Sequence, residues 1–84
     1  MRPKDILSRL FWDKRLQPED YSITFIHRGA PGDSKTISCS SVTKAAKSWF
    51  LYAEGGTEVF IPYHRILEIN NIKTNEILWK KISR

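Results

Sequence analysis

The chain has 84 residues and a mass of 9.8 kDa, the size of one small domain, which excludes an enzyme whose cleft lies between two separate lobes. With 40% hydrophobic and 27% charged residues, its composition is that of a globular fold and not of a disordered chain. The 14 Lys and Arg exceed the 9 Asp and Glu, and the formal net charge of +5 favours a polyanionic partner, nucleic acid before an anionic membrane.

Residues 3–12 are predicted to form a helix. Pro3 suits the first helical turn, where its missing N–H needs no partner, and Asp5 places negative charge near the positive end of the helix dipole. An apolar stripe at helical spacing consists of Ile6, Leu7, Leu10 and Phe11. We expect this stripe to face the core.

Residues 21–28 alternate between two sets of side chains, which predicts a strand with Tyr21, Ile23, Phe25 and His27 on one face. A turn containing two glycines and a proline follows at residues 29–33, after which residues 35–38 can pair back as a short strand. Residues 40–47 are ambiguous, because Ser40 or Ser41 can cap a short helix that contains Lys44, Ala45 and Ala46.

Further strands are predicted at residues 49–53, 58–61, 65–70 and 76–82. The whole chain therefore reads as one helix followed by about five or six short strands with hairpin-like connections. We expect an α+β fold in which the N-terminal helix packs on a small, curled, mostly antiparallel sheet or partly open barrel. Because there is no internal repeat or linker, a single domain is expected over residues 1–84.

The N-terminus has no apolar segment of the kind found in signal peptides, and no apolar run approaches the length of a membrane span. The single cysteine, Cys39, excludes an internal disulfide and is consistent with a reducing compartment. We therefore expect a cytoplasmic protein that has no membrane partner.

Metal and catalytic chemistry have little support in the sequence. Zinc sites need at least three protein ligands, and the two histidines, His27 and His64, have no suitably spaced companions, so neither a metal nor another cofactor is expected. Cys39 lacks the setting of a nucleophile and is interpreted as a small packed residue. One enzymatic alternative stays open, in which the two imidazoles act as acid and base on a phosphodiester.

Each histidine is followed by an arginine, a pair in which the imidazole can hydrogen-bond a phosphate oxygen while the guanidinium binds two oxygens. The backbone N–H groups of residues 29–32 could add donors for an anion, although an ordinary turn is the simpler interpretation. Aromatic rings beside basic groups are used by several small folds to stack unpaired bases. We expect Trp49 and Trp79 in the core and Tyr63, beside a proline and a histidine, at the surface.

Three segments resemble a known family, namely Trp12-Asp13, the Arg-Gly-Ala-Pro-Gly segment at residues 28–32, and the Ile-Pro-Tyr-His-Arg-Ile segment at residues 61–66. The chain is similar over essentially its whole length, including a terminal strand with Trp79, to small archaeal proteins now described as the RNA cyclic-group end-recognition domain. Related domains occur in larger eukaryotic proteins beside phosphoesterase-like domains. The resemblance implies recognition of RNA ends that carry a 2′,3′-cyclic phosphate.

The resemblance implies a binding site for RNA and phosphate that consists of Trp12, Asp13, Arg28, Gly29, Gly32, Tyr63, His64 and Arg65. In this site Arg28 or Arg65 would hold the phosphate and His64 would donate to it, while Tyr63 would stack on the terminal base. Asp13 would orient an arginine or accept from a ribose hydroxyl, and it suits a helix-end cap or turn equally well.

The expected partner is therefore RNA, single-stranded or at its ends, in processing or repair, with an RNA-processing protein as a further candidate. Two alternatives remain: a phosphodiesterase acting through His27 and His64, and a protein–protein interaction module. Recognition without catalysis is favoured, because no third catalytic group stands at a telling spacing and 84 residues leave little depth for a water-excluding pocket.

Overall fold

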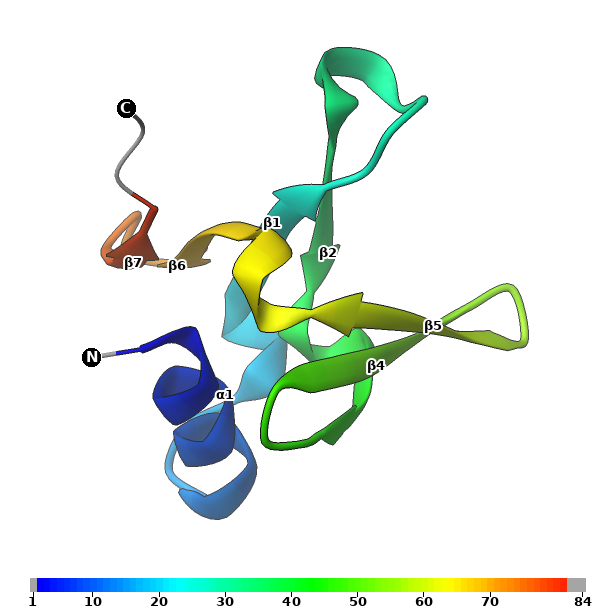
Figure 1. Ribbon diagram of the computed structural model, residues 1–84. Helices are drawn as coiled ribbons and strands as arrows, with labels where there is room; N and C mark the ends of the chain where they lie inside the picture. The colour runs from blue at the N-terminus through cyan, green and yellow to red at the C-terminus, as the bar shows by residue number, and fades with distance from the viewer. Residues whose placement is uncertain (1, 82–84) are drawn as a thin grey trace.

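The computed structural model describes residues 2–81, which form one α-helix and two antiparallel sheets (Figure 1). The helix is α1 (Pro3–Trp12). The strands are β1 (Tyr21–Ile26), β2 (Ser34–Ser38), β3 (Val42–Ala45), β4 (Trp49–Glu54), β5 (Thr57–Pro62), β6 (Ile66–Asn71) and β7 (Ile77–Lys80). One sheet has the order β2-β1-β6-β7, and the other has the order β3-β4-β5. The α+β class is therefore confirmed.

Two sheets replace the single curled sheet or partly open barrel of five or six strands that the sequence predicts. The chain leaves the first sheet after β2 through the 3₁₀ turn η3 (Cys39–Ser41) and returns to it only at β6. At the return, β5 ends on Pro62, which has no N–H to continue a ladder, and the 3₁₀ turn η4 (Tyr63–Arg65) follows. These two turns separate the strands into two sheets.

The helix α1 has the predicted limits. The Asp5 carboxylate accepts a hydrogen bond from the Arg2 N–H at 3.2 Å, which helps to begin the helix. Of the predicted stripe, Ile6, Leu7 and Leu10 are buried, whereas Phe11 is 48% exposed in the last turn. No helix among residues 2–81 is long and apolar enough to cross a membrane.

The core lies between the two sheets and α1. The central strand β1 contributes Ile23 and Phe25, both fully buried, and the second sheet contributes Phe50, Tyr52 and Ile61 from its inner face. Cys39 is buried as predicted, and burial raises the pKa of its thiol to about 12.

Residues 40–47 do not form the short helix that their serines and alanines allow. Val42 is buried and lies opposite Tyr52, and Ala45 lies opposite Phe50, so β3 pairs along β4. A helix this short is marginal by itself, whereas the strand gains ladder hydrogen bonds and a buried valine. Tertiary pairing therefore overrides the local helix propensity at this segment.

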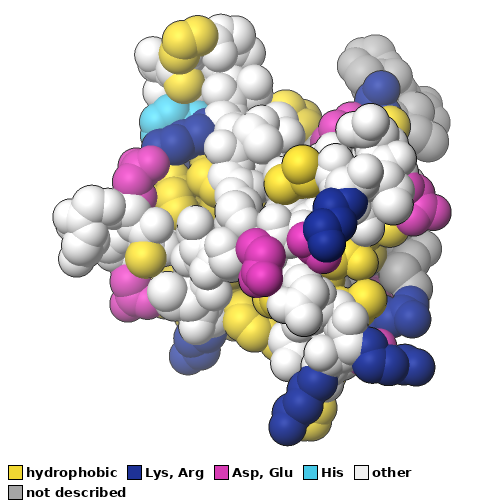
Figure 2. Space-filling model, turned by 180° about the vertical axis from the view of Figure 1, so that it is seen from behind, with side chains coloured by type: hydrophobic (Ala, Val, Ile, Leu, Met, Phe, Trp, Pro, Cys, Tyr) yellow, Lys and Arg dark blue, Asp and Glu magenta, His cyan; other side chains and the backbone are white. Residues whose placement is uncertain are grey.

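Charged side chains of both signs are interspersed on the face shown in Figure 2. Among residues 2–81, three ion pairs join opposite charges: Asp13 with Arg15 at 3.0 Å, Asp20 with Lys73 at 3.6 Å, and Glu54 with Lys35. Exposed pairs of this kind contribute little to stability.

Candidate functional site

The turn between β5 and β6 carries three of the predicted site residues. Pro62 pairs with Trp49 in one sheet, and the buried Ile66 pairs with Phe25 in the other, so η4 connects the two sheets. Between these two anchors, the side chains of His64 and Arg65 are left exposed.

Tyr63 is half-buried, in contrast to the exposed position that the sequence predicts. Its ring stacks on Phe50 with ring centroids 6.0 Å apart, and its hydroxyl donates to the Ala46 carbonyl at 2.6 Å. Its N–H donates to the Ser48 carbonyl at 3.1 Å. Burial raises the pKa of the Tyr63 hydroxyl above its ordinary value. The turn at residues 46–48 covers this tyrosine, and only the fold brings the two segments together.

A pocket of about 460 Å³ is lined by Ile26, Arg28, His64 and Arg65, and we call it the arginine hollow. Arg28 follows β1, whereas His64 and Arg65 precede β6. Because β1 and β6 are antiparallel neighbours, the end of one strand lies beside the start of the other. The structure thus brings three of the predicted phosphate-binding residues to one place.

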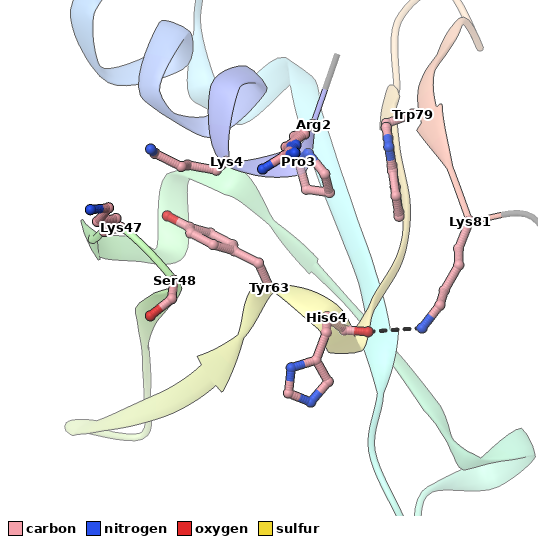
Figure 3. A pocket seen from close by; sticks show the side chains of 9 residues that line it. All are labelled: Arg2, Pro3, Lys4, Lys47, Ser48, Tyr63, His64, Trp79 and Lys81. Atoms are coloured by element: carbon pink, nitrogen blue, oxygen red, sulfur yellow. Dashed lines mark hydrogen bonds between the residues drawn. The ribbon is translucent and has the colours of Figure 1, made fainter.

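A second pocket, of about 430 Å³, contains Tyr63 and Trp79, and we call it the aromatic hollow (Figure 3). Trp79 is half-buried and lines this pocket, although the sequence predicts it in the core. The cationic side chains around the aromatic hollow are Arg2, Lys4, Lys47 and Lys81. Among the described residues, the linings of both hollows contain no Asp or Glu.

His64 lines both hollows and therefore joins them. Lys81 Nζ donates to the His64 carbonyl at 2.9 Å, the contact drawn in Figure 3, and the Lys81 N–H donates to the Leu67 carbonyl at 2.8 Å. These two bonds hold the end of β7 beside η4. The two hollows thus share one lining residue, and their cationic side chains include Arg28 in one and Lys47 in the other.

The glycine-containing loop after β1 is closed on itself. Gly29 and Gly32 have φ values of 92° and 69°, which only glycine adopts at little cost. The Gly29 N–H points at the Asp33 carboxylate at 3.5 Å, and the His27 N–H donates to the Asp33 carbonyl at 2.9 Å. A carboxylate thus already occupies the position that an anion would take at Gly29, so the glycines shape the loop that carries Arg28.

Trp12 and Asp13 lie apart from the other predicted site residues. The end of α1 is at the bottom of Figure 1 and the loop after β1 is at the top. Trp12 is 85% exposed. The Asp13 carboxylate accepts from Arg15 Nε and Nη2, both at 3.0 Å, and hydrogen bonds from this side chain lower the pKa of Asp13 to about 2.

His27 lines neither hollow, and its ring packs edge-on against Phe25 with centroids 6.3 Å apart. The two histidines therefore do not share one hollow. Within residues 2–81, no group of three His, Cys, Asp or Glu side chains is placed to hold a metal ion.

Sequence reasoning missed the cationic rim of the aromatic hollow. Its members come from the start of α1, the turn at residues 46–48 and the end of β7. Each is an ordinary surface residue in its own segment. The one local signal is Trp79, which is followed by two lysines.

Fold and hollows together define a small α+β protein with a basic, aromatic-lined surface where its two sheets meet. Residues 1–81 match the family model described as the MJ1316 RNA cyclic group end recognition domain, and the chain belongs to this family.

The relatives of this chain include archaeal proteins designated UPF0248. The protein of Methanococcus vannielii is 43% identical over 79 residues, covering 94% of this chain and 90% of the relative. The protein of Methanocaldococcus jannaschii is 41% identical over 78 residues, covering 93% and 91%. A more distant relative from Saccharolobus islandicus is 32% identical over 81 residues, covering 96% and 100%. No solved structure matches the chain.

Proposed function

We propose that this protein recognises RNA ends that carry a 2′,3′-cyclic phosphate and holds them at the two hollows joined by His64. The family description names recognition of RNA ends with a cyclic group. The observation that carries the proposal is that Arg28, His64 and Arg65 line one hollow, although they come from separate parts of the chain.

The chemistry of the arginine hollow suits a cyclic phosphate. Such a group carries one negative charge and two non-bridging oxygens. A guanidinium offers paired N–H donors that match two such oxygens, and Arg28 and Arg65 supply two guanidinium groups. The imidazole of His64 adds a third donor beside them. Gly29 and Gly32 contribute by shaping the loop that presents Arg28.

The aromatic hollow suits the nucleoside that bears the phosphate. Tyr63 and Trp79 present aromatic surfaces on which a base can stack, and the neighbouring lysines can contact the preceding phosphates. Because His64 lines both hollows, a terminal nucleotide can place its phosphate in one and its base in the other.

The placement of the histidines supports recognition over catalysis. An acid–base pair acting on one phosphodiester needs both imidazoles within hydrogen-bond reach of it. His27 packs against Phe25 and lines neither hollow, so only His64 is positioned to contact the phosphate.

Trp12 and Asp13 lie outside the end-binding site in this proposal. Asp13 is engaged by Arg15, which supports the turn interpretation of this residue. The exposure of Trp12 and its neighbour Phe11 is the observation that favours the second candidate, a protein-interaction module. If the protein binds RNA ends at the two hollows, Trp12→Ala should leave the affinity for RNA unchanged.

The test compares three RNA oligonucleotides of identical sequence that end in a 2′,3′-cyclic phosphate, a 3′-phosphate or a 3′-hydroxyl. We expect affinity, measured by fluorescence anisotropy with a 5′ label, to fall in that order. A site that senses charge alone would prefer the 3′-phosphate. Mass spectrometry after incubation should return the cyclic end unchanged, whereas a linear phosphate product would favour the phosphodiesterase. Equal affinity for all three ends would contradict end recognition.

A further inference from the structure

The outer face of the β3–β4–β5 sheet carries aromatic side chains at the surface. Leu51 lies opposite Phe60 on β5 and opposite Lys44 on β3, so these three side chains share this face. Trp49 lies two residues before Leu51 and points to the same side. We call Lys44, Trp49, Leu51 and Phe60 the outer patch.

Phe60 and Trp49 form an exposed aromatic pair rather than part of the core. Phe60 is 54% exposed, and Trp49, predicted in the core, is half-buried outside the core cluster. Their ring centroids are 5.3 Å apart, and Lys44 Nζ lies 5.5 Å from the centroid of the Trp49 ring. Aromatic rings on a sheet face with a cation beside them are the means by which several folds stack single-stranded bases.

The outer patch adjoins the aromatic hollow at the turn between β3 and β4. Lys47 and Ser48 line the hollow, and Trp49 is the next residue in the chain. Tyr63 binds this turn through both its hydroxyl and its N–H, so the turn is fixed against the hollow. The outer patch therefore begins one residue beyond the lining of the aromatic hollow.

Charge favours a polyanion over a second copy of this chain as the occupant. Lys44 lies beside the Trp49 ring, Lys47 precedes Trp49 by two residues, and the chain as a whole carries a net charge of +5. The acidic residue at the far end of this face, Glu58, accepts a hydrogen bond from Thr43 at 2.5 Å. Pairing two such faces would bring like charges together, whereas RNA phosphates would neutralise them.

We propose that the outer patch binds the nucleotides that precede the RNA end, with bases stacked on Trp49 and Phe60 and phosphates beside Lys44 and Lys47. The ligand is then a single-stranded tail of several nucleotides and not a lone terminal nucleotide or a blunt duplex end. This role rests on the proposed function, because the patch continues the site that holds the end.

The test uses cyclic-phosphate RNAs of two and eight nucleotides, and the octanucleotide annealed to its complement as a blunt duplex. We expect the single-stranded octanucleotide to bind about tenfold tighter than the dinucleotide, since each stacked base adds affinity, and the duplex to lose this gain. Phe60→Ala should remove most of the gain while leaving dinucleotide affinity unchanged, and Phe60→Tyr should keep it. Ile72→Ala, at a side chain that is 50% exposed elsewhere, is the matched control.

The outcomes separate the two proposals. If the dinucleotide binds with selectivity for the cyclic end but the octanucleotide gains nothing, or if the gain persists in Phe60→Ala, the outer patch does not bind RNA and end recognition stands. If affinity rises with RNA length in wild type but not in Phe60→Ala, and the three RNA ends bind equally, then the outer patch binds RNA and end recognition is wrong. A Phe60→Ala variant that only abolishes self-association in sedimentation would make the patch an interface between copies and overturn the inference.

Discussion

Arg28 and Arg65 reach the arginine hollow from opposite directions along the chain. Phe25 and Ile66 pair across β1 and β6, and each arginine lies within three residues of this pair, at the end of the sheet where β1 finishes and β6 begins. Because both members of the pair are fully buried, the positions of the two arginines depend on the core. His64 is placed by its backbone, through the bond from Lys81.

The paired N–H donors of Arg65 should contribute to RNA affinity in addition to its positive charge. We expect Arg65→Ala to weaken binding of a cyclic-ended RNA roughly tenfold or more, since a hydrogen bond to a charged group is worth about 1.5–3 kcal/mol. Arg65→Lys, which keeps the charge but not the paired donors, should recover only part of that loss. Lys14→Ala removes one charge from an exposed position outside both hollows and should change affinity by less than about twofold. An equal loss of RNA affinity in Lys14→Ala and Arg65→Ala would mean that binding depends only on the overall charge of the protein.

Asp13 should titrate well below an ordinary aspartate because of its hydrogen bonds from Arg15. Its folded-state pKa is lowered to about 2, so its contribution to stability is fully present above about pH 4, where the unfolded carboxyl is also ionised, and is lost as the pH falls towards about 2. A side-chain carboxyl NMR titration should show this midpoint, and Arg15→Ala should return it to about 4. A wild-type midpoint near 4 would show that the Asp13–Arg15 contact does not persist in solution.

At the scale of elements, local patterns predicted most of the regular segments but not how they assemble. α1 and β1 follow from apolar spacing, which depends on neighbours in the chain. The strand β3 and the separation into two sheets do not, because Val42 gains its burial and its pairing only opposite Tyr52 on β4. A pattern of period two determines which residues lie on each face of a strand, but it does not determine which strands pair with it.

The same distinction applies to the site. Arg28, His64 and Arg65 stand in compact motifs, so the sequence could single them out. Lys47 and Lys81 belong to segments that meet only through the fold, and the one local signal is the position of Lys81 shortly after Trp79. Tyr63 was predicted to be exposed because its covering residues, Phe50 and the turn at 46–48, are distant in sequence.

The loop after β1 owes its conformation to its glycines. Gly32 has a φ of 69°, and a Cβ there would meet nothing within 4 Å, so substitution costs backbone strain without a clash. We expect Gly32→Ala to lower the free energy of unfolding by about 1–2 kcal/mol in urea denaturation. Gly32→Asn should cost less, because asparagine tolerates the left-handed region better. Equal stability of Gly32→Ala and wild type would contradict the left-handed conformation at this position.

At the scale of the whole molecule, both hollows are lined by positive charge. The cationic side chains that line the two hollows are Arg2, Lys4, Arg28, Lys47, Arg65 and Lys81. Elsewhere, the face in Figure 2 mixes both signs. Under the proposed function, a net charge of +5 arranged in this way would attract an RNA backbone and orient it along the hollows.

Salt should weaken RNA binding in proportion to the phosphates contacted. For a single-stranded octanucleotide we expect log K to fall linearly with log salt, with a slope of about −2 to −4, which corresponds to roughly three to six phosphates. The dinucleotide, with fewer phosphates, should give a shallower slope. A slope near zero for the octanucleotide would show that the basic hollows do not contact the RNA backbone.

The most direct test of the site is a ¹⁵N chemical-shift titration of the protein with a short single-stranded RNA that ends in a 2′,3′-cyclic phosphate. If the end binds where His64 joins the two hollows, the largest backbone amide shifts will fall at residue 28, at residues 63–65 and at residues 79–81. The 3′-hydroxyl RNA should reduce the shifts at residues 28 and 63–65 most. Shifts concentrated at residues 11–17, with residues 28 and 63–65 unmoved, would place RNA binding at the end of α1 and contradict the proposed site.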